Sequence, residues 1–157
     1  MANNFKQVEN IQIENAQIRF RNFKGEIDKF NPSGRRTFAV LISHEQAVAL
    51  SEEGWNVKYL KPRDDDEEPQ AYLTVEAKFG VAPPTVWLIA GRKRTRLDEE
   101  TISQLDFAEL ANVDLVISPY HWEMPGKSGI KAYLKKGYFT VVVDSFDAKY
   151  AEMDFDD

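Results

Sequence analysis

Apolar residues alternate with polar ones along most of this 157-residue chain, in short segments separated by turn residues. Such alternation places successive side chains on opposite faces of a strand, so that one face packs and the other meets solvent. The pattern predicts strands over residues 11–20, 38–42, 55–59, 71–79, 86–90, 113–117 and 130–143. A doubly wound parallel sheet would need a helix after nearly every strand, and those helices are missing. We therefore expect a mainly β fold, organised as a small barrel.

The alternation gives way to a helical pattern in two places. Ser43 is a suitable N-cap for a short helix that ends at Gly54, because serine accepts backbone N–H bonds and glycine adopts the left-handed conformation that ends helices. A second helix is expected from Asp98 to Leu110, with acidic residues near its positive N-terminal end. Between the strands, residues 62–69 are expected to form an exposed loop and residues 91–96 a basic turn.

Two acidic segments, 64–68 and 144–157, dominate the formal charge of −6. Without them the rest of the chain carries a net positive charge, so a pI near 5.0 conceals a mildly basic body. Acidic tails on basic bodies are typical of proteins whose nucleic-acid surface is attenuated or that recruit a partner, although a tail can also serve solubility alone. We expect one domain over residues 1–150 and a disordered acidic tail over 151–157.

Composition disfavours several other classes of protein. No apolar run approaches the roughly 18 residues that span a bilayer, and the N-terminus lacks the pattern of a signal peptide. The chain has no cysteine and two histidines, His44 and His121, so a zinc site or a catalytic triad has few candidate residues. The GKS sequence at 126–128 lacks the first glycine of a phosphate-binding loop. We expect no cofactor, no metal, no membrane partner and no enzymatic activity, in the reducing cytoplasm.

Cations and aromatic rings interleave in three stretches of the chain. This combination suits single-stranded nucleic acid, since cations neutralise phosphates while ring faces stack on bases. The candidate binding residues are Arg19, Arg21, Phe23, Lys24, Phe30, Arg35 and Arg36 in the first stretch, Arg92, Lys93 and Arg94 in the second, and Tyr120, Trp122, Lys127, Lys131, Tyr133 and Lys135 in the third.

Strand alternation divides these residues between core and surface. It assigns Phe20 and Phe38 to the core and leaves Phe23 and Phe30 in a connecting loop, where a ring either stacks on a base or pins the loop to the core. In the last strand it predicts one face with Lys131, Tyr133 and Lys135, and the opposite face with Ala132, Leu134 and Lys136. The first choices as stacking platforms are Phe23, Trp122 and Tyr133.

Several of these segments together resemble phage and prophage single-stranded DNA-binding proteins. The resemblance rests on RNFKG at 21–25, Phe30-Asn31, Gly34, Arg36, Phe38, GWNVK at 54–58, PYHWE at 119–123 and GKSGIKAYLK at 126–135, and it extends from about Asn10 to Tyr150. It implies an OB-fold barrel that coats single-stranded DNA during phage replication or recombination in the host cytoplasm, without enzymatic activity.

The leading functional hypothesis is therefore sequence-tolerant binding of single-stranded DNA. The alternative is a protein-interaction module in which the aromatic and basic strand face docks a partner chain, while a nuclease would need a convergent carboxylate site that the sequence does not provide. The acidic tail is the expected contact for replication or recombination proteins. Unlike the better-known bacterial single-stranded DNA-binding proteins, whose acidic tail ends in an apolar residue, this chain ends in Asp156-Asp157.

Overall fold

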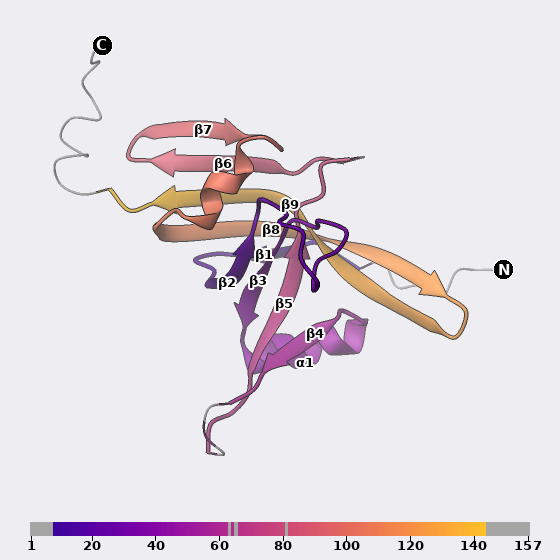
Figure 1. Cartoon of the computed structure of the whole chain (residues 1–157). Helices are drawn as coiled ribbons and strands as arrows, with labels where there is room; N and C mark the ends of the chain where they lie inside the picture. The colour runs from indigo at the N-terminus through magenta and orange to yellow at the C-terminus, as the bar shows by residue number, and fades with distance from the viewer. Residues whose placement is uncertain (1–7, 63, 65, 81, 144–157) are drawn as a thin grey trace, which may run out of the picture.

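The computed structural model describes residues 8–62, 64, 66–80 and 82–143, and within them strands predominate (Figure 1). Its elements are β1 (Ile11–Ile13), β2 (Ile18–Asn22), β3 (Thr37–Ile42), α1 (His44–Glu53), β4 (Val57–Leu60), β5 (Gln70–Glu76), β6 (Thr85–Ala90), β7 (Lys93–Leu97), the 3-10 helix η1 (Ile102–Asp106), β8 (Leu110–Met124) and β9 (Lys127–Val141). The mainly β prediction is confirmed. The acidic tail predicted for residues 151–157 lies outside the described residues.

Helix α1 forms where the sequence predicts it, and both of its ends are capped. The Ser43 hydroxyl accepts from the Gln46 backbone N–H at 3.1 Å, and the Gln46 side chain accepts from the Ser43 N–H at 2.8 Å. This reciprocal capping box satisfies two N–H groups that a helix start leaves unpaired. At the other end Gly54 adopts φ 105°, a left-handed conformation that glycine reaches without steric cost. Among the described residues, no helix is long and apolar enough to cross a membrane.

Strand β9 is the centre of the sheet, because it pairs with three other strands. Along one edge it is antiparallel to β8 over its whole length, and along the other it runs parallel first to β5 and then to β6. The main path of the sheet is β1-β8-β9-β5-β3-β2, with β4 added to β5 and β7 added to β6. Within the described residues the sheet is not closed by strand pairing between β1 and β2. The segment between those strands instead bridges the ends, since Ala16 N–H donates to the Val113 carbonyl and Leu41 N–H donates to the Gln17 carbonyl.

The core lies on the inner face of this curved sheet and is built around three phenylalanine rings. Phe23 stacks on Phe38 with centroids 5.0 Å apart, and Phe139 meets both rings edge-on at 5.6 and 6.4 Å. Offset and edge-to-face contacts at these distances are the favoured arrangements of aromatic pairs. Phe23 and Phe139 have no exposed surface. Phe23 lies in the loop after β2, as predicted, but its ring pins the loop to the core, and the prediction that it is a stacking platform is wrong.

An irregularity in β2 explains this error and a second one at Phe20. The pairing of β2 with β3 shifts between Arg19 and Asn22, and Phe20 adopts a left-handed φ of 54°. Such a bulge reverses the alternation of side chains along the strand. Phe20, predicted to be core, is therefore 64% exposed and meets Tyr72 edge-on on the outer face.

The predicted helix from Asp98 to Leu110 is largely absent, and the short 3-10 helix η1 stands in its place. Hydrogen bonds to β2 and the loop after it divert this segment from α-helical geometry. The Asp106 carboxylate accepts from the N–H groups of Phe23 and Lys24 at 2.6 and 3.0 Å, and Arg21 donates to the Leu105 carbonyl at 2.8 Å. That carbonyl would otherwise accept a helical bond from four residues further on.

The segment around Asp98 has its own local hydrogen bonds. The Thr101 hydroxyl donates to the Asp98 carboxylate at 3.0 Å and, as the largest cause, holds the pKa of Asp98 below its ordinary value. The preceding basic segment also differs from expectation. Only Gly91 and Arg92 form a turn, with Gly91 at φ 62°, and Lys93–Leu97 continues as the strand β7.

Candidate functional site

The outer face of β9 carries a row of cations and tyrosines. Ile130, Ala132 and Leu134 point inward and are buried, which places Lys131, Tyr133 and Lys135 outward, as predicted. The pairing with β8 then shifts, because Val116 lies opposite Lys136 whereas Ile117 lies opposite Leu134. Lys135 therefore has no partner residue on β8. Beyond it the regular alternation continues, with Gly137 and Phe139 pointing inward. The bulge therefore brings Lys136 to the outer face with Tyr138, contrary to the prediction that Lys136 lies opposite.

Strands β6 and β7 extend this row with a tryptophan on β6 and two arginines beside it on β7. Trp87 lies directly opposite Tyr138 on β9 and opposite Arg96 on β7, so the three side chains share the outer face. The guanidinium carbons of Arg94 and Arg96 lie 4.8 and 5.7 Å from the Trp87 ring centroid. Both distances are within the range of cation–π attraction, which orients the guanidinium groups over the ring. On the inner face of the same hairpin, Val86 and Leu97 are buried and attach it to the core.

A second aromatic group lies further along β8 and β9. The rings of Tyr120 and Tyr133 are 5.4 Å apart, and Tyr120 is about half exposed. The ammonium groups of Lys131 and Lys78 lie 5.5 and 5.7 Å from the Tyr133 ring. Tyr133 therefore has two cations near its ring, as Trp87 has two arginines near its own.

These residues lie on the outer face of β7, β6, β9 and β8, or next to it, and the four strands are neighbours in the sheet (Figure 1). We call this surface the basic-aromatic face, and it consists of Trp87, Tyr120, Tyr133, Tyr138, Lys78, Arg94, Arg96, Lys131, Lys135 and Lys136. Two carboxylates share the surface. Asp114 accepts bonds from the Asn15 N–H and the Asn112 side chain, and Glu76 pairs with Lys131 at 3.2 Å. The cations outnumber them, so the surface favours anions.

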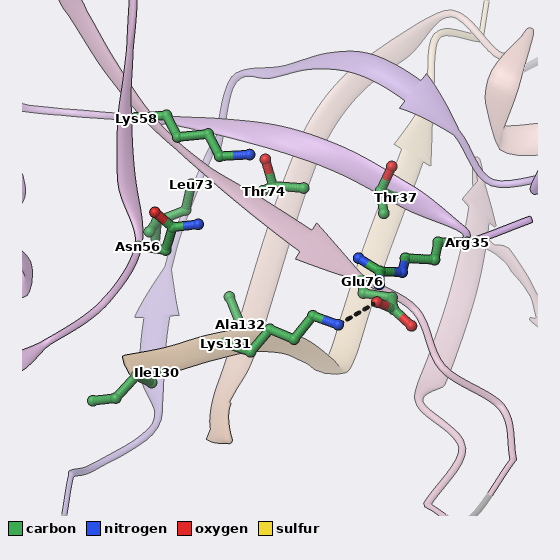
Figure 2. A pocket seen from close by; sticks show the side chains of 10 residues that line it. All are labelled: Arg35, Thr37, Asn56, Lys58, Leu73, Thr74, Glu76, Ile130, Lys131 and Ala132. Atoms are coloured by element: carbon green, nitrogen blue, oxygen red, sulfur yellow. Dashed lines mark ion pairs between the residues drawn. The ribbon is translucent and has the colours of Figure 1, made fainter. Parts of the chain in front are cut away.

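A cavity of about 120 Å³ opens where β9 meets β5 (Figure 2). Its lining combines three cations with polar groups that both donate and accept hydrogen bonds. The cations are Arg35, Lys58 and Lys131, and Glu76 lies between two of them in the view of Figure 2. The remaining lining residues are Thr37, Asn56, Leu73, Thr74, Ile130 and Ala132.

Five of the predicted binding residues belong to the basic-aromatic face, and a sixth lines the adjoining cavity. The five are Arg94, Tyr120, Lys131, Tyr133 and Lys135, and the sixth is Arg35. They come from segments that are distant in sequence, and the sheet brings them together.

Three other predicted residues serve the fold. Phe23 is core, as described above. Arg21 donates to the carbonyls of Leu105 and Ala108 at 2.8 and 2.7 Å. Arg36 donates to the carbonyls of Phe23 and Lys24, at 2.7 and 3.0 Å. Backbone carbonyls therefore engage both guanidinium groups, and the cation cluster that the sequence indicated around Arg21 does not converge on one anion site.

The remaining predicted residues lie at the margins of the molecule. Arg19 and Lys24 are exposed, and Phe30 is 84% exposed with the Lys29 ammonium 4.9 Å from its ring. Arg92 and Lys93 lie at the tip of the β6–β7 hairpin and Lys127 at the tip of the β8–β9 hairpin. Trp122 packs over Gly129 on the neighbouring strand, so closely that a Cβ at Gly129 would come within 2.8 Å of the indole ring.

Five residues of the basic-aromatic face are not among the predicted binding residues: Trp87, Tyr138, Lys78, Arg96 and Lys136. Trp87 stands in the run VWLIA, which reads as a buried strand because four of its five residues are aliphatic. A period-two reading of the adjoining KRTRL would have paired Arg94 and Arg96 on one face. The four cations and the glycine at 91–96 are equally typical of an exposed turn, so the sequence contains no signal that pairs this segment with Trp87.

The chain matches a protein family, and its fold is similar to solved structures. The family model for a phage ssDNA-binding domain matches residues 1–157, and no curated protein sequence matches the chain. Among solved structures, the fold is similar to the single-stranded DNA-binding protein from bacteriophage Enc34 in complex with ssDNA, with a TM-score of 0.55, 13% identity, and coverage of 87% of this chain and 89% of that one. A C-terminal truncation of the same phage protein gives a TM-score of 0.54 at 13% identity, covering 86% and 87%. On the match over its whole length, this chain belongs to the family of phage ssDNA-binding domains.

Proposed function

We propose that this protein binds single-stranded DNA along the basic-aromatic face, with bases stacked on the rings and phosphates held by the flanking cations. Each base stacked on an aromatic side chain contributes about 1–3 kcal/mol in proteins of this type. Every base has a ring face, so stacking on Trp87, Tyr138, Tyr133 and Tyr120 tolerates any sequence. Duplex DNA cannot use these platforms, because its bases are already stacked and paired.

The observation that carries the proposal is the position of Arg94 and Arg96, both on β7, within 4.8 and 5.7 Å of the Trp87 ring centroid. The two guanidinium groups place positive charge beside a half-buried ring, which suits a nucleotide because its base stacks on a ring while its phosphate pairs with a cation. Tyr133 repeats the arrangement with Lys131 and Lys78. Two such units on neighbouring strands support a path for several successive nucleotides.

In this proposal the protein coats and protects single strands during phage replication or recombination, in the cytoplasm of the host bacterium and without a catalytic step. The OB-like architecture of the related phage proteins is consistent with binding across an outer strand face. The acidic segment 144–157, which lies outside the described residues, is proposed to contact replication or recombination proteins.

Titration of labelled single-stranded and duplex oligonucleotides at two salt concentrations tests the proposal. We expect tight binding of the single strand and weak binding of the duplex. The slope of log K against log salt should be about −0.7 for each phosphate neutralised. Equal affinity for both forms, or no binding of either, would contradict the proposal and favour the alternative of a docking surface for a protein chain.

A further inference from the structure

Glu76 is a buried carboxylate in the middle of a surface that is otherwise suited to a polyanion. The residue is 9% exposed, and it lines the cavity of Figure 2 at the C-terminal end of β5. Its Oε1 atom is buried and has no hydrogen-bond donor among the described residues. The Lys131 ammonium group lies 3.2 Å from this oxygen, which gives an ion pair without a well-directed hydrogen bond.

A carboxylate at this position weakens a purely phosphate-binding surface, because it repels phosphate at short range. It also costs desolvation energy, which a buried acceptor recovers only from hydrogen-bond donors. Phosphate oxygens carry no such donors at neutral pH. The N–H groups on the edges of bases are the donors that single-stranded DNA brings to this face.

Glu76 lies close enough to Tyr133 for its carboxylate to meet the edge of a base stacked on the Tyr133 ring. Glu76 and Tyr133 are partners in the parallel pairing of β5 with β9, so their side chains are neighbours on the outer face. The cavity that Glu76 lines has a volume of about 120 Å³ and opens where β5 meets β9. A base stacked on Tyr133 can therefore direct its edge toward Glu76.

We propose that Glu76 accepts a hydrogen bond from the exocyclic amino group of the base stacked on Tyr133, and so gives one nucleotide position a preference for an amino-bearing base over thymine. The inference rests on the proposed function, because it needs single-stranded DNA on this face. Carboxylates pair with the N4 amino group of cytosine in the same way in DNA-reading proteins. Thymine presents the O4 carbonyl in place of that amino group, so its one donor on this edge is the N3–H, next to a carbonyl that repels the carboxylate. Lys131, whose side chain is 37% exposed, can then turn to the adjacent phosphate.

The other role open to Glu76 is to hold Lys131 in position for a phosphate. In that case loss of the carboxylate would weaken binding to every sequence by the same factor. A base-reading role changes the ratio between sequences, so the ratio is the quantity to measure.

The experiment uses the full chain and oligo(dT) of one site length, in which a single cytosine replaces thymine at each position in turn. We expect one position at which cytosine tightens binding about fivefold or more, and no effect elsewhere. A 2-pyrimidinone nucleotide at that position, which lacks the amino group, should lose the gain. The wild-type protein suffices for these measurements, so they do not depend on any variant folding.

Variants then assign the effect to the carboxylate. Glu76→Gln should abolish the cytosine preference. Lys135→Met, which removes a cation of the same face outside the cavity, should weaken the binding of oligo(dT) and of its cytosine variant by the same factor, so that the ratio of the two affinities stays unchanged. Equal affinity at every cytosine position would overturn the proposal, as would a Glu76→Gln variant that keeps the wild-type ratio. If oligo(dT) and its cytosine variants all fail to bind, the proposed function is itself wrong, and the base preference falls with it.

Discussion

Replacement of Trp87 by alanine is the most direct test of the basic-aromatic face. The variant removes one stacking platform and keeps both arginines, whose guanidinium groups lie 4.8 and 5.7 Å from the ring centroid. One lost stack amounts to about 1–3 kcal/mol, which corresponds to a dissociation constant roughly 5- to 150-fold higher. Because no phosphate contact is removed, the salt slope should stay at the wild-type value. Arg94→Gln should instead remove one phosphate contact, so the slope of log K against log salt should become flatter by about 0.7.

Fluorescence anisotropy of a labelled oligo(dT), measured at several salt concentrations, separates the two effects. Intrinsic fluorescence adds an internal check, since Trp55 is only 4% exposed and Trp87 lies on the proposed binding surface. Trp87→Phe should remove most of the quenching that DNA causes, and Trp122→Phe is the matched control. The reasoning is refuted if a folded Trp87→Ala protein binds single-stranded DNA with wild-type affinity, or if its loss of affinity merely follows a loss of thermal stability.

Other substitutions distinguish fold from binding. Phe23→Ala should lower the free energy of unfolding by about 3–5 kcal/mol in urea titrations, because it empties a fully buried aromatic site, while Phe30→Ala should leave stability unchanged. Arg21→Gln and Arg36→Gln should each destabilise by about 1–3 kcal/mol, since each leaves backbone carbonyls without their donor, and should change the salt slope of DNA binding little. Deletion of residues 151–157 removes four carboxylates and should tighten binding of single-stranded DNA at low salt, with a difference that shrinks as screening increases.

Each of these expectations has a contradicting result. A Phe23→Ala protein that keeps its wild-type urea midpoint would place the ring outside the core. A flatter salt slope in a stable Arg21→Gln protein would return that arginine to the binding surface. Equal affinities of the full and shortened chains at low ionic strength would leave solubility or partner recruitment as the role of the acidic tail.

Local signals in the sequence predicted much of the fold. Helix α1 was predicted with its N-cap and its terminal glycine because a capping box depends only on residues close together in the chain. The two longest strands, β8 and β9, were predicted in part: β8 extends beyond both predicted ends, whereas β9 begins before its predicted start and ends before its predicted end. The failures come from contacts between distant segments. Asp106 and Arg21 form hydrogen bonds between the segment of η1 and the segment of β2. Because of these bonds, η1 forms where the sequence predicts an α-helix.

The candidate site was predicted less completely, because bulges decide which side chains face outward. One unpaired residue in β2 exchanged the expected positions of Phe20 and Phe23, and one in β9 moved Lys136 to the same face as Tyr138. Composition and alternation contain no signal for where an extra residue is inserted. Tyr133 and Lys131, which precede the bulge of β9, were placed correctly for the same reason.

The pairing of β9 with three strands also constrains how the chain reaches its native state. Strands β5 and β6 are synthesised before β9, and each of them has an edge that pairs with β9, the last strand of the sheet. Contacts between segments so far apart in sequence form slowly, since the long intervening loops must close first. Until they do, β5 and β6 expose unpaired N–H and C=O groups that can pair with the strands of other chains. We therefore expect a shortened chain that ends before β9 to aggregate during synthesis, and a complete chain to refold with slow, concentration-sensitive kinetics.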